Sequence, residues 1–338
     1  MIPKVHLGAF SAAVLRLDAA EETERIVGAI RTTIVETLKR RGAVLGLSGG
    51  IDSSVCAALC ARAIGPERVI GLLMPEADSA ADSTELGQLV AAHLGIRTMV
   101  EEITPILEAT GCYSRRDAAI REVIPEYTSG YKSKIVRPSG LDRDGYRVFS
   151  VVVESPAGQE TRARLTADTY LAVVAATNFK QRVRKMMEYH HADRFQCAVV
   201  GTPNRLEYDQ GFFVKNGDGA ADLKPIAHLY KTQVYQLAEY LGIPEAICRR
   251  QPTTDTYSLA QSQEEFYFSV PFDKLDLCLY GLNHGVAASD VASAAGLGRQ
   301  QVERAYRDIA SKRRATGYLH LPPILVEDVC RTDAQHIC

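Results

Sequence analysis

Residues 46–54, GLSGGIDSS, bring glycines, hydroxyl groups and one carboxylate together where an apolar run ends. Gly49 and Gly50 allow positive φ angles and close approach of the backbone to a ligand. The hydroxyl groups belong to Ser48, Ser53 and Ser54. The alanine-rich run that follows predicts a helix whose first amides attract an anion. The stretch lacks the Lys of the common triphosphate-binding loop. We interpret it as an anion-binding loop with Asp52 beside the anion, rather than as an ordinary glycine-rich turn.

A second group of polar residues, GTPNRLEYDQGFF, follows a later apolar run at 197–200. Open parallel sheets bind ligands at the carboxyl ends of their strands, where the strand order reverses. The loops after the first and fourth predicted strands should therefore border one crevice, with Asp52 and Glu207 facing each other across it. Two carboxylates together with phosphate oxygens suit Mg²⁺. Taken alone, Glu207 would be interpreted as a surface acid.

Basic residues are needed in the same crevice to neutralise phosphate groups. Lys215 and Lys231 are candidates, and so are Arg182 and Arg184 in the segment TNFKQRVRKMMEYHH. Basic residues at that density are also typical of a solvated helix face. Asp218 lies between two glycines, which suits a carboxylate held against a ligand and equally suits a plain turn.

The elements that must position these residues alternate along the chain. Apolar runs predict strands at 44–47, 69–74, 96–100 and 197–200, and helical periodicity predicts helices at 21–41, 82–94, 168–191 and 231–241. The β-α-β-α-β order predicts an α/β fold: a Rossmann-like, doubly wound parallel sheet in three α/β/α layers.

The alternation stops at 112–166, where glycines and prolines punctuate the chain. Within it, 147–154 and 160–165 predict a β-hairpin with a five-residue turn. We interpret the whole segment as an insertion into the α/β fold.

Residues 289–296 and 299–312 predict a small helix–turn–helix pair, for which packing is favoured over DNA binding because no basic patch accompanies it. The expected organisation is an N-terminal arm at 1–20, a main domain at 21–250 and a helical region with a tail at 251–338.

Composition limits the function classes. The chain has 338 residues and a net charge of −2, so no strong field favours nucleic acid. Neither a membrane span nor a signal-peptide pattern is found in the sequence. Eight cysteines occur without a C-x-x-C pair, which favours buried thiols in a reducing, cytoplasmic setting.

Together the motifs resemble the NAD synthetase family, the ammonia-dependent type among the ATP pyrophosphatases. SGGIDSS resembles the family's pyrophosphate loop, NFKQRVRKMMEY at 178–189 its arginine helix, and QPTTD at 251–255 a further family segment. The closest match is GTPNRLEYDQGFFVKNGDGAADLKP at 201–225. Its KNGDGAAD part distinguishes this family from relatives that share only the loop. The resemblance covers about 43–105 and 168–315.

The resemblance implies an ATP-dependent, amide-forming ligase that needs no protein nucleophile. The carboxylate of nicotinic acid adenine dinucleotide (deamido-NAD) attacks the α-phosphorus of ATP, which gives an acyl-adenylate and pyrophosphate. Ammonia then displaces AMP and leaves NAD. The implied cofactor is Mg²⁺, ATP is the co-substrate, and the expected assembly is a homodimer. About 42 residues precede the loop, too few for a glutamine-hydrolysing domain, so free or partner-supplied ammonia is the expected nitrogen source.

The resemblance also implies residue roles. Catalytic roles fall on Asp52, Lys215, Asp218 and Lys231. ATP contacts fall on Gly46, Ser48, Gly49, Gly50, Asp52, Ser53, Ser54, Thr202, Lys231 and Thr253. Contacts to the dinucleotide fall on Asn178, Arg182, Arg184, Tyr189, Lys215, Asp218 and Asp222. The Mg²⁺ ligands are expected to be Asp52 and Glu207.

Two departures leave alternatives open. Val174 stands where an aromatic ring is expected, and the insertion carries Lys132, Lys134 and Arg137, which could reach phosphates or form a solvated hairpin. A paralogous ligase for a different carboxylate is therefore one alternative. Another is a different adenylating enzyme with the same loop. A third is a nucleotide-binding regulator without catalysis.

Overall fold

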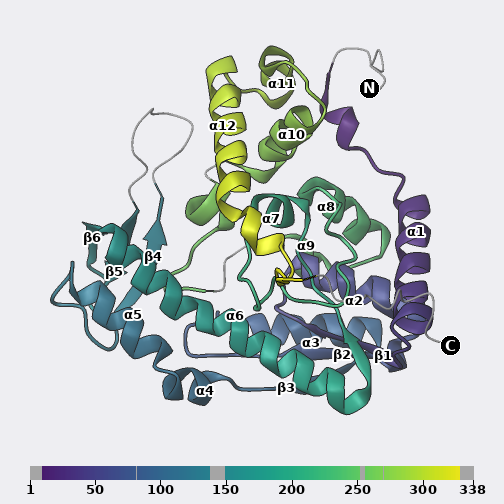
Figure 1. The fold of residues 1–338 in the computed structure, drawn as a ribbon, viewed down its shortest axis with the longest axis horizontal. Coiled ribbons are helices and arrows are strands. Elements are labelled where there is room, and N and C mark those ends of the chain that lie inside the picture. The colour runs from purple at the N-terminus through teal and green to yellow at the C-terminus, as the bar shows by residue number, and fades with distance from the viewer. Residues whose placement is uncertain (1–9, 81, 138–148, 252–255, 269, 328–338) are drawn as a thin grey trace.

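The computed structural model describes residues 10–80, 82–137, 149–251, 256–268 and 270–327 (Figure 1). At its centre is a parallel sheet with the strand order β3-β2-β1-β7. The strands are β1 (Gly42–Gly46), β2 (Val69–Leu73), β3 (Arg97–Val100) and β7 (Cys197–Val199). β1 pairs with β7 on one side and β2 on the other. The predicted α/β fold, and the adjacency of its first and fourth strands, are confirmed.

Helices cover both faces of this sheet, so the layers are α/β/α. On one face, Ala43 and Leu45 of β1 share a core with α1 (Ala19–Arg31), α2 (Ile51–Ile64), α3 (Ser83–Leu94) and α8 (Lys231–Tyr240). On the other, Val44 packs with α6 (Ala167–Phe195). Successive side chains of a β-strand point to opposite faces of the sheet, which is why Ala43 and Leu45 face one helical layer and Val44 faces the other. β1 and β2 are buried on both faces, which is why they read as continuous apolar runs.

The helix expected at 21–41 is α1 followed by a π-helical turn, η2 (Thr32–Thr37). α1 begins at Asp18, whose carboxylate accepts from the backbone N–H groups of Ala20 and Glu21. Leu15, in the short helix η1 (Ala12–Leu15), is buried, although this part of the chain was expected to be a loose arm.

The segment 112–166 contains a second, antiparallel sheet of β4 (Lys132–Val136), β5 (Ser150–Glu154) and β6 (Glu160–Arg164). The predicted hairpin is confirmed, since β5 pairs with β6 and Glu154 lies opposite Glu160, while 147–148 of its first predicted strand lie outside the described residues. The segment also contains a helix that was not predicted from the sequence. α5 (Cys112–Arg121) packs on α6, and one of its buried positions is Arg116, so apolar periodicity does not show it. α4 (Thr104–Ala109) precedes it.

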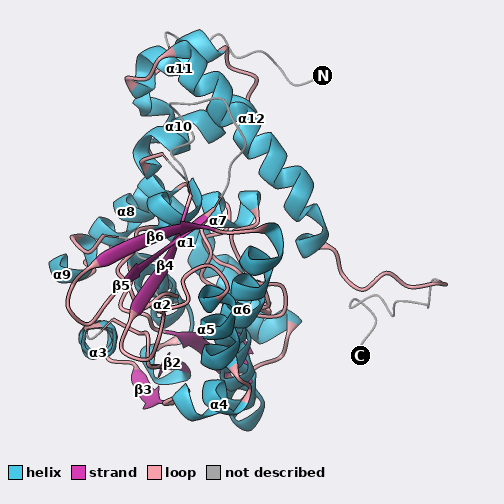
Figure 2. Ribbon diagram, turned by 90° about the vertical axis from the view of Figure 1, so that its left-hand side faces the viewer, coloured by secondary structure: helices cyan, strands magenta, loops and turns pink. Residues whose placement is uncertain are grey.

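At one end of the molecule, α10 (Phe272–Asn283), α11 (Ala288–Ala295) and α12 (Arg299–Thr316) form a helical lobe (Figures 1 and 2). This lobe contains the predicted helix–turn–helix pair. Its core includes Leu206 and Tyr230 from the α/β part, so the two parts share apolar contacts.

The remaining short elements are η3 (Pro66–Arg68), α7 (Arg205–Gln210), α9 (Glu245–Cys248), η4 (Glu264–Phe268) and η5 (Gly317–His320). Among the described residues, no helix combines the length and the apolar character needed to cross a bilayer.

Candidate active site

A cavity of about 480 Å³ lies at the carboxyl ends of β1, β2 and β7. It collects most of the residues predicted from the sequence, although they come from distant parts of the chain. These are Gly46, Ser48, Gly50, Asp52, Ser53, Asn178, Arg182, Arg184, Thr202, Glu207, Lys215, Asp218 and Lys231. The crevice expected between the loops that follow the first and fourth strands is therefore present.

Four predicted residues do not line this cavity: Gly49, Ser54, Tyr189 and Asp222. Ser54 Oγ donates to the Gly50 carbonyl at 2.8 Å, inside the loop. Asp222 Oδ2 accepts from the Val199 N–H at 2.7 Å, and Tyr189 donates to Asp222 Oδ1 at 3.3 Å. These groups support the surrounding backbone in this structure. Thr253 lies outside the described residues.

The loop before α2 has free donors for an anion. Gly49 adopts a φ of +71°, and a Cβ there would lie 2.7 Å from Leu86 Cβ. Ser48 Oγ accepts from the Gly50 N–H at 3.2 Å, and Ser53 Oγ donates to the Gly50 carbonyl at 3.0 Å. α2 begins after Gly50 without a side-chain cap, so its first amides remain available to phosphate oxygens.

Asp52, Lys231 and Glu207 form a compact charged cluster beside this loop. Asp52 is ion-paired with Lys231, and its Oδ1 accepts from Asn204 Nδ2 at 3.1 Å. Burial and the Asp52 charge raise the pKa of Glu207 to about 8. Burial alone would lower the pKa of Lys231, but the carboxylates of Asp52 and Glu207 raise it. Lys231 is thus a protonated lysine that is ion-paired with Asp52 and stabilised further by the nearby charge of Glu207.

This cluster has the donor chemistry of a magnesium site. Desolvation and the charge of Asp52 both disfavour the ionised form of Glu207, and a divalent cation held between the two carboxylates would offset that charge. No group of three or more His, Cys, Asp or Glu side chains within the described ranges is arranged to hold a metal. Phosphate oxygens and water would have to supply the other ligands, as is usual for Mg²⁺.

Lys215 and Asp218 sit on the loop after α7. Lys215 Nζ donates to the carbonyls of Tyr318 and Leu321, at 2.9 and 3.1 Å, beyond the end of α12. Asp218 Oδ1 accepts from the Val214 N–H at 2.8 Å, and burial raises the pKa of Asp218 above its ordinary value. The two side chains line the cavity but are engaged with the protein itself.

The sequence reasoning missed several residues that line the cavity. Lys185 and Glu188 form a buried ion pair on α6, and their i, i+3 spacing with opposite charges was the available signal. Arg250 Nη1 donates to the Ser48 carbonyl at 3.3 Å. Val174 has no ring itself, but it belongs to one apolar cluster with the rings of Tyr170, Tyr257 and Phe266, which also line the cavity.

The basic residues of the insertion, Lys132, Lys134 and Arg137, do not themselves line the cavity. Lys134 Nζ donates to the Ala260 carbonyl at 3.3 Å, and Arg137 donates to the Tyr267 carbonyl and to Asp308, both at 2.8 Å.

The parallel sheet, the glycine-rich loop before α2 and the charged cluster at its edge are those of an α/β protein of the ATP pyrophosphatase type. A family model described as NAD synthase matches residues 22–123 and 154–315. The chain belongs to the NAD synthase family. Residues 124–153, which include β4 and most of β5, fall between the two matched parts.

Relatives support this assignment. The chain is 60% identical over 320 residues to the NH(3)-dependent NAD(+) synthetase of Rhizobium meliloti strain 1021, covering 95% of this chain and 96% of the relative. It is 35% identical over 267 residues to the NH(3)-dependent NAD(+) synthetase of Thermotoga neapolitana, a match that covers 79% of this chain and 86% of the relative. Solved structures share the fold. The NH3-dependent NAD synthetase of Campylobacter jejuni superposes with a TM-score of 0.59 at 24% identity, covering 92% and 100%. An NMN synthetase from Francisella tularensis superposes with a TM-score of 0.61 at 21% sequence identity, and the match covers 92% of this chain and 99% of that one.

Proposed function

We infer that this chain is an amide-forming ligase that converts deamido-NAD to NAD with ATP and ammonia, releasing AMP and pyrophosphate. The observation that carries this inference is a convergence on one cavity. The SGGIDSS loop, the Asp52–Lys231–Glu207 cluster and the Lys215–Asp218 loop all border it, in a chain of the NAD synthase family. The other adenylating enzymes and the regulator without catalysis are not favoured.

In the first step, the deamido-NAD carboxylate attacks the α-phosphorus of ATP and pyrophosphate leaves. The uncapped amides at the start of α2 and the hydroxyls of Ser48 and Ser53 border the cavity, and in this proposal they bind the departing pyrophosphate. The Lys231 ammonium neutralises part of its charge. Because the protein forms no covalent bond, catalysis depends on positioning and on charge neutralisation.

Asp52 and Glu207 are the residues that would hold Mg²⁺, and the ion, when bound, would offset charge on the phosphates. Asn204 and Gln263 orient the two carboxylates, since each donates a side-chain N–H to one of them, at 3.1 and 2.9 Å.

In the second step, ammonia attacks the acyl carbon and AMP leaves. Ammonium must first lose a proton, and Asp218 is the candidate group to orient it. Burial raises the pKa of Asp218, which suits a carboxylate that accepts a proton. Arg182 and Arg184, on the α6 wall, are candidates to bind the dinucleotide phosphates.

We also propose that the protein works as a homodimer, as the family resemblance implies, and in the cytoplasm, as the cysteine pattern favours. Sedimentation equilibrium of the purified chain tests the assembly, and a monomer at micromolar concentration would contradict it.

The test of the function is a carboxylate screen. Purified protein with ATP, Mg²⁺, ammonium and deamido-NAD should release AMP and pyrophosphate and form NAD in equal amounts. The mononucleotide analogue of deamido-NAD is the competing substrate, because one structural neighbour is named NMN synthetase. Pyrophosphate release that ignores deamido-NAD but responds to another carboxylate would favour the paralogous ligase instead.

A further inference from the structure

Residues 256–263 form one wall of the cavity, although 256–261 have neither helix nor strand. Thr256, Tyr257 and Gln263 line the cavity directly. An irregular segment loses conformational entropy when it is fixed, so its position depends on contacts made by its neighbours. The structure supplies such contacts from two directions.

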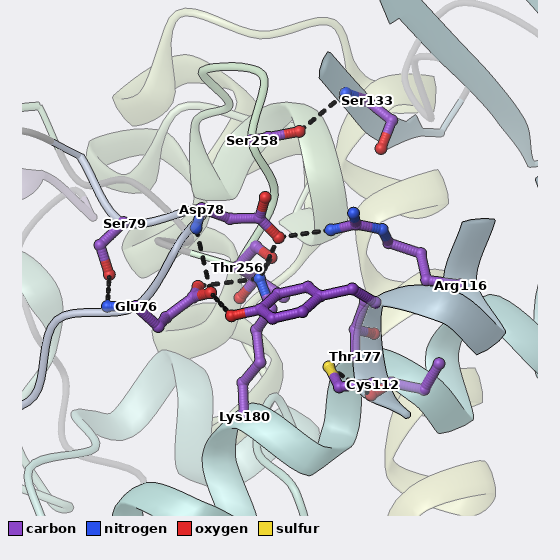
Figure 3. Close-up of polar contacts among 12 residues, drawn as sticks. Glu76, Asp78, Ser79, Cys112, Arg116, Ser133, Thr177, Lys180, Thr256 and Ser258 are labelled. Carbon is purple, nitrogen blue, oxygen red and sulfur yellow. Dashed lines mark hydrogen bonds and ion pairs between the residues drawn. The ribbon is translucent and has the colours of Figure 1, made fainter. Parts of the chain in front are cut away.

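The first set of contacts comes from Lys180 on α6 (Figure 3). Its ammonium is fully buried and donates to Glu76 Oε1 at 2.8 Å, to Asp78 Oδ2 at 2.6 Å and to the Thr256 carbonyl at 2.8 Å. An ammonium group has three N–H donors, so all three are used. One of them fixes the backbone at the start of the wall.

Neighbouring groups hold the two carboxylates of this cluster. Arg116 on α5 is ion-paired with Asp78, and Tyr113 donates to Glu76 Oε2 at 2.7 Å. A buried ion pair gains little net stability, because desolvation of its charges offsets their attraction. We therefore attribute to the cluster a role in placing the Thr256 backbone, rather than in stabilising the fold.

The second set of contacts comes from β4, in the segment that the family model leaves unmatched. The Ser133 N–H donates to Ser258 Oγ at 2.9 Å, and the Leu259 N–H donates to the Ser133 carbonyl at 3.1 Å. Gln261 Nε2 also donates to the Ile135 carbonyl. The wall segment therefore lies along the free edge of the inserted sheet.

The wall reaches the charged cluster through its last residue. Gln263 Nε2 donates to Glu207 Oε1 at 2.9 Å. A displacement of the wall would therefore move the donor that orients Glu207, and would reshape the cavity at Tyr257.

We propose that β4 of the inserted sheet and Lys180 of α6 are positioning elements that fix the wall 256–263 against the cavity. The inserted sheet thereby serves the active site through this wall, without contacting substrate. The kinetic part of this inference rests on the proposed function, whereas its structural part does not.

The decisive variant is Ser258→Ala with Gln261→Ala, because it removes two attachments to β4 without leaving a buried charge. The matched control is Ser155→Ala with Gln159→Ala. It changes the same residue types in the hairpin turn of the same sheet, where Ser155 Oγ accepts from the Gln159 N–H. Hydrogen exchange of peptides within 256–268 should be about tenfold faster in the first variant only. Its kcat/KM should fall about tenfold while that of the control stays near the wild-type value, because misplaced groups lose transition-state contacts.

Lys180→Gln tests the contact from α6, and it should likewise speed hydrogen exchange of the peptides within 256–268 and lower kcat/KM. If this variant does not fold, the Ser258→Ala, Gln261→Ala variant alone decides whether the proposal holds. Exchange in 256–263 equal to that of the wild type, or kcat/KM equal to that of the control, would overturn the proposal. If the wild type does not act on deamido-NAD, the proposed function fails, and exchange alone then decides whether β4 positions the wall.

Discussion

Asp52 is the residue on which most of the site's charges depend. It is ion-paired with Lys231 and accepts from Asn204, and its charge contributes to the raised pKa of Glu207. We expect Asp52→Asn and Glu207→Gln each to lower NAD formation by about 10²–10³-fold, because each removes one carboxylate of the proposed magnesium site. A coupled assay for NAD measures this.

Asp193→Asn is the matched control, since it neutralises an exposed acid at the far end of α6. Circular dichroism should show the same secondary structure in all three variants. Turnover near that of the wild type in either cluster variant would contradict a shared metal site.

Asp276 predicts a pH dependence of stability. Its carboxylate accepts from the backbone N–H groups of Lys231 and Thr232, at 3.3 and 2.7 Å. Burial nevertheless raises its pKa from 3.8 to about 7. The folded state therefore binds this proton more tightly than the unfolded state. The resulting stability is fully present below pH 3.8 and is lost as pH rises towards about 7.

An asparagine side chain stays neutral at every pH, so Asp276→Asn should remove this pH dependence of stability. Its full size is about 4 kcal/mol, at about 1.4 kcal/mol per pKa unit. The measurement is the free energy of unfolding in urea from pH 5 to pH 8, for the variant and the wild type. The wild type should lose more stability than the variant over this range. Parallel curves would show that Asp276 does not titrate there.

At the scale of elements, α7 links a helix cap to the site. Asn204 Oδ1 accepts from the Glu207 N–H at 3.3 Å, while its Nδ2 donates to Asp52. Asn204→Ala removes both contacts. Asn204→Ser keeps a capping hydroxyl but loses the donor to Asp52. We expect both variants to lose about tenfold in kcat/KM. Only the alanine variant should also lose the contribution of the helix cap to the free energy of unfolding, about 1 kcal/mol.

Urea unfolding and steady-state kinetics on the same preparations separate the two effects. If the serine variant kept wild-type kcat/KM, the bond from Asn204 to Asp52 would have no part in positioning that carboxylate.

Strands β1, β2 and β7 of the main sheet could be predicted because burial on both faces gives them continuous apolar runs. β4 was missed because its sequence, KSKIV, carries two lysines, and its pairing partner β5 is separated from it in the sequence. α5 was missed because ion pairs bury Arg116, and a buried arginine breaks the apolar pattern.

The loop residues of the site were predictable because glycine, serine and aspartate carry local chemistry at fixed spacing. The contact between Gln263 and Glu207 was not, because it joins residues that are 56 positions apart. Lys180 illustrates the same limit. Its sequence context indicates a basic helix face, but its partners Glu76, Asp78 and Thr256 are known only once the chain is folded.

At the scale of the whole molecule, the helical lobe and the α/β part share contacts rather than forming independent units. Leu206 and Tyr230 belong to the α/β part but are buried in the core of the lobe, and Asp276 of α10 binds the first amides of α8. We expect one cooperative unfolding transition, because loosening the lobe removes contacts that position Lys231.

Leu279→Ala tests this coupling, since Leu279 is fully buried in α10. The cavity it leaves should lower the free energy of unfolding by about 2–5 kcal/mol. Leu171→Ala, at a position that is 60% exposed on α6, is the control and should change it by less than about 0.5 kcal/mol. The measurement is urea unfolding followed by circular dichroism and by tyrosine fluorescence. Both signals should shift together in the Leu279 variant. Separate transitions, with the lobe unfolding first while the α/β part keeps its midpoint, would show that the lobe folds independently of the site.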